Sequence, residues 1–369
     1  MKKFFKILFK ILKWVLIVVV AAIVLFFIVR FIGQRINNKT PKGGINETMY
    51  VDINGTKQWI NIYGQDKDNP VLLYLHGGPG QPTSYEDYPV LRKLSDIYTV
   101  VNWDQRACGH SWTKDQMGTQ ITYEQLFSDG EEMTEFLLDY MDKDKISVMG
   151  ISWGAAFGAR LVLDNPERYD RFYAMSLPVD NIEIMKALKT EALEWTKDDP
   201  EYRAIAESII TDQAVFDGMT TEEQRQAAVE WDKLYAKYTE PNSEFAGDVN
   251  VVSAMIFCPY WSVKDYYNMF FASVPKKVED FPQYPYLDCC QWGNMSAISV
   301  LDRTDYKVPV YMIMGDKDYD AMTSVAKEYY DSITAPDKEY YEVEGGHYMP
   351  MLLSERLSEI VHETVNNEQ

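Results

Sequence analysis

A serine flanked by glycines lies at residues 150–154, which read Gly-Ile-Ser-Trp-Gly. This segment fits the pattern G-x-S-x-G, in which a tight turn from a strand to a helix holds the serine side chain at the strand end. Glycines two positions to either side remove the Cβ atoms that would clash in such a turn. An apolar segment precedes the motif and small residues follow it. The context predicts that Ser152 is a nucleophile.

A serine hydroxyl needs a general base within hydrogen-bonding distance, and the chain has four histidines. His347 follows two glycines just after the last predicted strand, where a loop can bring it over the serine. His110 lies in a loop and is a weaker competitor, His362 falls in an amphipathic terminal helix, and His76 begins a different motif. We therefore predict that His347 is the base.

The imidazole in turn needs a carboxylate that fixes its tautomer and stabilises its positive charge. Asp316 and Asp318 both lie on the loop that follows the predicted strand 308–314. The residues alone leave either aspartate open as this acid. The chain order of serine, then aspartate, then histidine is that of the α/β-hydrolase fold.

A glycine-rich turn at residues 76–80, His-Gly-Gly-Pro-Gly, follows the apolar run 71–75. Such a turn exposes backbone N–H groups, which an oxyanion hole uses to stabilise developing negative charge. The main-chain N–H groups of Gly78 and Trp153 are the candidates. The alternative is a phosphate-binding loop, which is disfavoured because no Gly-Lys-Ser/Thr sequence is present.

Five motifs resemble those of a known family when they are taken together and in order. They are HGGPG (76–80), WDQRACGHS (103–111), GISWG (150–154), GDKD (315–318) and GGH (345–347). This set resembles the prolyl aminopeptidase (proline iminopeptidase) family of serine peptidases, which are α/β-hydrolases with a helical cap. The resemblance covers about residues 50–366.

The resemblance assigns roles to individual residues. It implies Ser152 as the nucleophile, His347 as the base, and the N–H groups of Gly78 and Trp153 as the oxyanion hole. The family's G-x-x-D pattern falls on Gly315 and Asp318, so the resemblance implies Asp318 as the acid.

Three positions depart from the family's pattern. Ala107 stands where the family commonly has glycine after Asp-Gln-Arg, and Ile151 and Ala155 replace the usual neighbours of the serine motif. Family members recognise a free α-amino group through carboxylates of the cap, and no motif locates those carboxylates in this chain. The acidic residues of the expected cap, most of which we expect on solvated helix faces, include Glu183, Glu191, Glu194, Glu201 and Glu207.

Strand and helix patterns alternate along the body, which predicts a mainly parallel sheet covered by helices on both faces. Asn54-Gly55 between two alternating runs indicates a hairpin. Further strands are predicted at 71–75, 98–103, 145–150, 172–177, 308–314 and 339–343, and helices at about 123–140, 153–163 and 351–365. The fold class is therefore α/β, of the α/β-hydrolase type.

A long, mostly helical stretch interrupts this alternation and predicts a cap over the strand ends. Between residues 180 and 300 it carries 21 acidic and 10 basic side chains. The expected domains are an N-terminal basic segment with a transmembrane helix (1–35), a linker (36–47), a hydrolase core (48–179 and 304–369) and a helical cap (180–303).

The N-terminal segment has the character of a membrane anchor. Residues 14–29 are sixteen consecutive uncharged residues, and Phe31 and Ile32 follow a single Arg30. With Arg30 reaching the interface, the run comes close to the ~20 residues that cross a bilayer. It is longer than the core of a cleavable signal and no small-x-small cleavage site follows it, so a retained single-pass anchor is expected. The flanking charges favour a cytoplasmic N-terminus and an extracytoplasmic body.

The charge distribution argues against nucleic acid as a partner. The first 42 residues carry nine basic and no acidic side chains, whereas the rest carries 27 basic and 56 acidic ones. An acidic body repels phosphate.

The four cysteines show no CxxC spacing, so neither a disulfide scaffold nor a zinc site is expected. No metal and no organic cofactor are implied.

The expected function is a serine hydrolase, namely an aminopeptidase that releases N-terminal residues from short peptides through an acyl-enzyme. A carboxylesterase or another small-molecule hydrolase with the same three residues is the alternative. Epoxide hydrolases and dehalogenases need a carboxylate nucleophile and are disfavoured, since residue 152 is serine. A non-catalytic binding protein of the same fold is a remote third option.

Overall fold

The computed structural model describes residues 2–86, 88–239, 247–269 and 283–366. Eight strands within these residues form one sheet, in the order β1-β2-β4-β3-β5-β6-β7-β8. β2 is antiparallel to both neighbours, and the other pairs are parallel. The strands are β1 (Ile45–Ile53), β2 (Thr56–Gly64), β3 (Val71–Leu75), β4 (Thr99–Asp104), β5 (Ile146–Ile151), β6 (Tyr169–Met175), β7 (Val310–Gly315) and β8 (Lys338–Val343).

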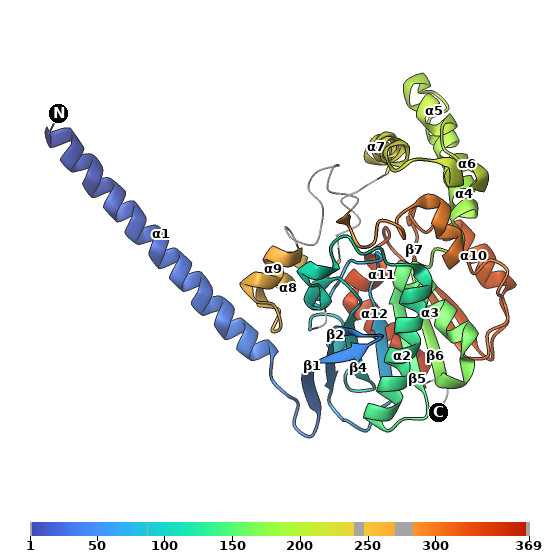
Figure 1. The fold of residues 1–369 in the computed structure, drawn as a ribbon, viewed down its shortest axis with the longest axis horizontal. Helices are drawn as coiled ribbons and strands as arrows, with labels where there is room; N and C mark the ends of the chain where they lie inside the picture. Colours follow the sequence, from blue (N-terminus) through green and yellow to red (C-terminus); the bar gives the residue numbers. More distant parts are fainter. Residues whose placement is uncertain (1, 87, 240–246, 270–282, 367–369) are drawn as a thin grey trace.

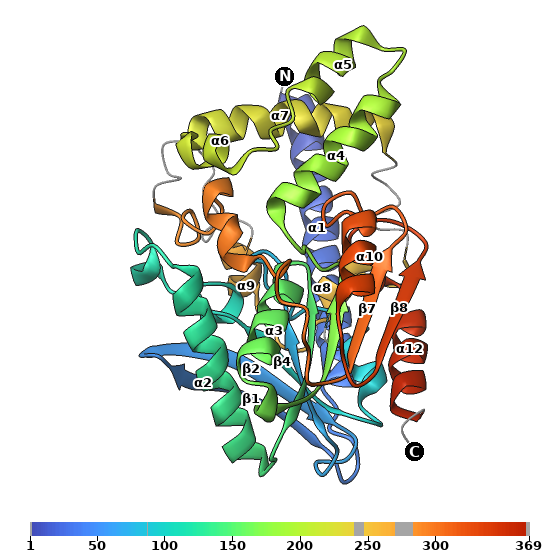
Figure 2. The same ribbon diagram turned by 90° about the vertical axis from the view of Figure 1, so that its right-hand side faces the viewer.

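Alternate residues of the central strands pack into two separate cores, one on each face of the sheet. Leu73 and Leu75 of β3 belong to the core that includes side chains of α2 (Tyr123–Met141) and α3 (Trp153–Asp164), which lie in front of the sheet in Figure 2. Leu72 and Tyr74 belong to the other core, with side chains of α12 (Ser354–Asn366). Burial on both faces explains why β3, β5 and β7 are almost continuously apolar. The predicted fold class is confirmed.

The boundaries of β6 differ from the predicted strand 172–177. The strand begins at Tyr169, which is fully buried although the polar residue Asp170 follows it. It ends at Met175 because Ser176 has a φ of 46°, which takes the backbone out of the extended conformation.

The chain between β6 and β7 is mainly helical, as expected for a cap. Figures 1 and 2 show α4 to α7 beyond one end of the sheet. Residues 240–246 and 270–282 of the predicted cap lie outside the described residues, and its limits at 180 and 303 stay a prediction. The helices are α4 (Asn181–Trp195), α5 (Pro200–Glu207), α6 (Gln213–Gly218), α7 (Thr221–Tyr238), α8 (Val251–Phe257) and α9 (Val263–Tyr267).

Helix α1 (Lys2–Asn37) extends away from the body and is long and apolar enough to cross a membrane (Figure 1). The helix continues to Asn37 and β1 begins at Ile45, so only residues 38–44 of the predicted linker lie between the two elements. The C-terminal end of α1 contacts the body. The side-chain amide of Gln34 donates to the carbonyl oxygens of Cys258 and Trp261, at 2.6 and 2.9 Å.

Candidate active site

Ser152 lies between β5 and α3 in a turn that only small neighbours permit. Its φ and ψ are 54° and −125°, a backbone conformation that is rare for a residue with a side chain. A Cβ at Gly154 would overlap the carbonyl oxygen of Leu75, and one at Gly150 would overlap the carbonyl oxygen of Gly154. Gly154 is therefore required where the turn packs against β3, and Gly150 is required where the turn packs against itself.

His347 lies on the loop after β8 and contacts the loop after β7. Its Nδ1 is 3.0 Å from both carboxylate oxygens of Asp318. Because an ionised carboxylate only accepts hydrogen bonds, this nitrogen carries the proton, which leaves Nε2 as the basic nitrogen of the neutral ring. His347 is 5% exposed and Asp318 is 1% exposed, so water competes little for this hydrogen bond.

The neighbours of Asp318 keep its carboxylate ionised. Burial alone would raise the pKa of this carboxyl, but the charge and hydrogen bond of His347 outweigh burial, and the Ala321 N–H and the Ser176 hydroxyl add to this effect. The net result is a pKa below the ordinary value. A carboxylate in this state can stabilise a positive charge on the imidazole.

Asp316, the other aspartate left open by the sequence, contacts a different group. Its Oδ1 accepts the N–H of Gly345 at 2.7 Å. Asp316 therefore holds the glycine pair that precedes His347, whereas Asp318 contacts the imidazole itself.

One pocket joins the residues that the sequence singles out. Ser152, His347, Gly78 and Trp153 all line it, together with cap residues that include Trp292. The residues come from the ends of β3, β5 and β8, which lie at the same edge of the sheet because these strands are parallel.

The glycine-rich turn lies next to the serine. A Cβ at Gly77 would stand 3.4 Å from the Cβ of Ser152. Gly78 has a φ of 117°, which side-chain-bearing residues rarely adopt. The N–H of Trp153 belongs to the first turn of α3, where backbone donors have no acceptor within the helix. Both predicted donors are thus close to Ser152.

Hydrogen bonds to Gln105 link three of the motifs, a role that sequence reasoning did not assign. The backbone N–H of Gln105 donates to Nε2 of His76 at 3.2 Å, and its side-chain amide donates to the His76 carbonyl oxygen at 3.2 Å. The indole of Trp153 donates to the Gln105 side-chain oxygen at 3.0 Å. Gln105 thereby fixes the glycine-rich turn relative to the serine turn.

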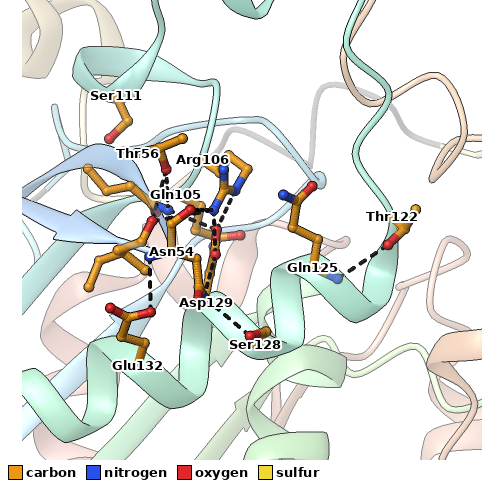
Figure 3. Close-up of polar contacts among 12 residues, drawn as sticks. Asn54, Thr56, Gln105, Arg106, Ser111, Thr122, Gln125, Ser128, Asp129 and Glu132 are labelled. Atoms are coloured by element: carbon orange, nitrogen blue, oxygen red, sulfur yellow. Dashed lines mark hydrogen bonds and ion pairs between the residues drawn. The ribbon is translucent and has the colours of Figure 1, made fainter.

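A buried ion pair next to Gln105 was also not predicted (Figure 3). Arg106 donates two hydrogen bonds to Asp129 of α2, both at 2.6 Å. Asp129 also accepts the side-chain amide of Asn54 at 3.0 Å, from the hairpin turn. No local spacing could have revealed this pairing, because the three residues are far apart in the chain.

The other histidines have partners away from this pocket. Nδ1 of His110 lies 2.6 Å from Asp104, and its Nε2 lies 3.3 Å from the carbonyl oxygen of Tyr260. Burial lowers the pKa of His110, but the hydrogen bond and charge of Asp104 outweigh burial and raise it overall. His362 hydrogen-bonds to Ser358 of its own helix.

No group of three or more His, Cys, Asp or Glu side chains within the described residues is arranged to hold a metal ion.

Comparison with known proteins agrees with this geometry. Residues 70–206 match the family described as alpha/beta hydrolase fold. The chain has the α/β-hydrolase fold. A crystal structure of proline iminopeptidase from Mycobacterium smegmatis aligns with 87% of this chain and 98% of its own length, with a TM-score of 0.54 and 19% identity. An epoxide hydrolase aligns with 88% of this chain and 100% of its own length, with a TM-score of 0.53 and 18% identity.

Curated relatives match part of this chain with higher sequence identity. A probable aminopeptidase of Bacillus subtilis (strain 168) is 34% identical over 130 residues, which are 35% of this chain and 41% of the relative. Proline iminopeptidase of Lactobacillus helveticus (strain DPC 4571) is 30% identical over 116 residues, which are 31% of this chain and 37% of the relative. The chain therefore spans about two fifths of the length of these curated relatives.

Proposed function

We propose that the chain is a serine aminopeptidase that releases N-terminal residues from short peptides, with proline favoured in the first position. The observation that carries the proposal is the pocket that both Ser152 and His347 line, with Asp318 hydrogen-bonded to His347. The names of the curated relatives support the substrate class.

In this mechanism, Ser152 attacks the scissile carbonyl carbon while Nε2 of His347 takes the hydroxyl proton. Asp318 holds the ring and stabilises its charge, and the N–H groups of Gly78 and Trp153 stabilise the oxyanion. His347 then gives the proton to the leaving amine. Water, activated by the same histidine, releases the acyl group and restores Ser152.

The carboxylates of Asp320 and Asp232 are our candidates for binding the substrate's ammonium group. Asp320 lines the pocket of Ser152, and both aspartates line an adjoining pocket under the cap together with Trp231 and Trp292. The indole rings stack 4.7 Å apart. Carboxylates beside aromatic faces suit a cation. The acids named from the sequence fit less well, since Glu194 and Glu207 of that set form ion pairs with neighbours on their own exposed helix faces.

Proline and alanine arylamides, compared with short-chain esters, test the proposal. We expect Asp320→Asn to raise the KM for arylamides about tenfold, because the ammonium loses its counter-charge, while the KM for an acetate ester stays the same. Ester turnover without arylamidase activity would leave the carboxylesterase as the function. A fluorophosphonate probe that labels neither the wild type nor Ser152→Ala would instead indicate a binding protein.

We further propose that α1 anchors the hydrolase as a single-pass segment with the body outside the cytoplasm. The length and hydropathy of α1 support the anchor, and the five lysines before the apolar run support the direction. Fractionation with protease protection tests the direction. If the body is protected from protease in intact cells and the first residues are protected in inverted vesicles, the body lies in the cytoplasm and the proposed direction is wrong.

A further inference from the structure

A second pocket adjoins the one that contains Ser152. Gly77, Gln81 and Tyr348 line both pockets, so a molecule bound at the serine can extend from one into the other. The second pocket is bounded by Val251, the first residue of α8, and by residues of α11 (Met349–Leu352). None of these residues has a role in the mechanism above.

The walls of this second pocket are mainly apolar, and its acidic residue is Glu86. Met351 and Leu352 line this pocket together with Tyr85 and Glu86. Glu86 is 7% exposed. An apolar pocket favours an uncharged group, and an ionised carboxylate would weaken the binding of such a group.

Burial keeps the carboxyl of Glu86 neutral near pH 7. Burial raises its pKa to about 8, against smaller opposite effects of hydrogen bonds from Tyr85 and Thr83. Within the part of the chain that the structure describes, the titratable groups that interact with this region are the phenols of Tyr74, Tyr85 and Tyr348, and burial raises the pKa of Tyr74 and of Tyr85. Among the described residues, the pocket lining therefore carries no charge at neutral pH and gains a negative charge above pH 8.

The position of the pocket relative to His347 indicates which part of a substrate it receives. His347 gives its proton to the leaving amine, so the leaving group lies on the histidine side of Ser152. Tyr348 directly follows His347 and contacts its ring edge-on at 5.4 Å. Tyr348 and two residues of α11, Met351 and Leu352, also line the second pocket.

We propose that this pocket, lined by Glu86, Val251, Tyr348, Met351 and Leu352, binds the apolar side chain of the residue that follows the scissile bond. This assignment rests on the proposed aminopeptidase function, in which the N-terminal residue occupies the pocket under the cap. The hydrolase would then prefer peptides whose second residue is large and apolar over peptides whose second residue is glycine.

Proline dipeptide amides with glycine, alanine, leucine or phenylalanine in the second position test the assignment in the full-length chain. We expect the ratio of kcat/KM for leucine over glycine to exceed about tenfold in the wild type, from burial of the side chain. Val251→Phe should reduce this ratio about tenfold by filling the pocket. Val252→Phe, the same change at the neighbouring residue with 66% exposure, should leave it unchanged.

The charge of Glu86 supplies a second arm of the test. The wild-type ratio should fall between pH 7 and pH 9 as the carboxyl ionises, whereas Glu86→Gln should keep a constant ratio over this range. The assignment would be overturned if Val251→Phe left the leucine-over-glycine ratio of kcat/KM unchanged. It would also be overturned if Val251→Phe changed the preference for the first residue of the peptide instead of the second.

Failure of the aminopeptidase function can be told apart from failure of the pocket. If no peptide is cleaved, ethyl acetate and hexyl acetate serve as substrates instead. They share the acetyl group and differ only in the alcohol that leaves. A preference for hexanol that Val251→Phe removes would support the pocket as a leaving-group site. Equal effects of Val251→Phe on both esters would reject it.

Discussion

At the scale of single residues, Asp316 and Asp318 show how two neighbouring carboxylates take different tasks. Asp318 hydrogen-bonds to His347, whereas Asp316 accepts a backbone N–H of the loop that carries His347. Their spacing in the sequence is compatible with either task. The difference arises from the direction in which the loop after β7 turns, which depends on its packing against the loop after β8.

We expect Asp318→Asn to lower kcat about 10⁴-fold with little change in the thermal unfolding midpoint, because the imidazole loses its charge partner and its tautomer. Asp316→Asn is the matched control and should lower kcat less than about tenfold, since the amide oxygen of asparagine can still accept the N–H of Gly345. Steady-state kinetics with an ester substrate measure both. Equal losses in the two variants would contradict the assignment.

The backbone conformation of Ala107 explains why the resembling family commonly has glycine at this position. Its φ of 55° lies in the left-handed region, where glycine carries no Cβ penalty, and the resembling family commonly has glycine there. The residue type could be read from the sequence, but the strain could not, because nothing local to Ala107 requires a positive φ.

Ala107→Gly should therefore raise the free energy of unfolding by about 1 kcal/mol, through relief of this strain. Urea unfolding measures the change. Ala155→Gly is the contrasting variant, because Ala155 lies within α3, and it should lower the free energy of unfolding by about 1 kcal/mol. A destabilised Ala107→Gly protein would show that the strain is not significant.

At the scale of elements, local sequence patterns predicted those strand boundaries that depend on a single segment of the chain. β3 runs from Val71 to Leu75 as predicted, because a short apolar run bounded by turn residues fixes a buried strand. β1 begins at Ile45, earlier than the alternating pattern around residues 50–53 indicates, because its register with β2 pairs Ile45 with Gly64. Strand length there depends on the partner strand, which a single segment does not reveal.

Contacts between distant elements were beyond prediction from spacing. Arg106 follows β4, Asp129 lies in α2 and Asn54 lies in the β1–β2 turn, and both Arg106 and Asn54 hydrogen-bond to Asp129. The same holds for Gln105, which connects two predicted motifs.

Removal of one partner from this buried ion pair should be costly. We expect Asp129→Ala to lower the free energy of unfolding by about 3–5 kcal/mol, because it leaves the Arg106 guanidinium buried without a counter-charge. Glu132→Gln on the same helix is the control, and its more exposed contact with Asn54 should contribute less than about 1 kcal/mol. Denaturant unfolding followed by circular dichroism gives both values, and a loss below 1 kcal/mol for Asp129→Ala would be inconsistent with burial of the pair.

At the scale of the whole molecule, α1 has two parts, an exposed apolar length and a shorter part that contacts the body. Most of its length is apolar and exposed, but Arg30, Gly33, Gln34 and Asn37 form a half-buried stripe against residues 257–261. The sequence predicted the apolar stretch from its composition. The stripe was not predicted, because its partners are backbone carbonyl groups, which have no sequence signature.

Gln34→Ala should loosen the segment that α1 contacts. We expect faster hydrogen–deuterium exchange at residues 251–261, because two hydrogen bonds to Cys258 and Trp261 are lost. Arg35→Ala, on the exposed side of the same turn, should leave the exchange rates unchanged. Exchange measured in detergent-solubilised full-length protein tests this, and equal rates in all three proteins would contradict a role for the stripe.

The direction in which α1 leaves the body has a consequence for substrate supply. In Figures 1 and 2 the N-terminal end of α1 reaches the level of the cap helices, while the C-terminus lies at the opposite end of the molecule. A bilayer around α1 would thus lie on the side of the molecule that carries the cap helices. Under the proposed function, peptides would then arrive by diffusion through the thin layer of water between lipid and protein, and the short, hydrogen-bonded junction after α1 would set the height of that layer.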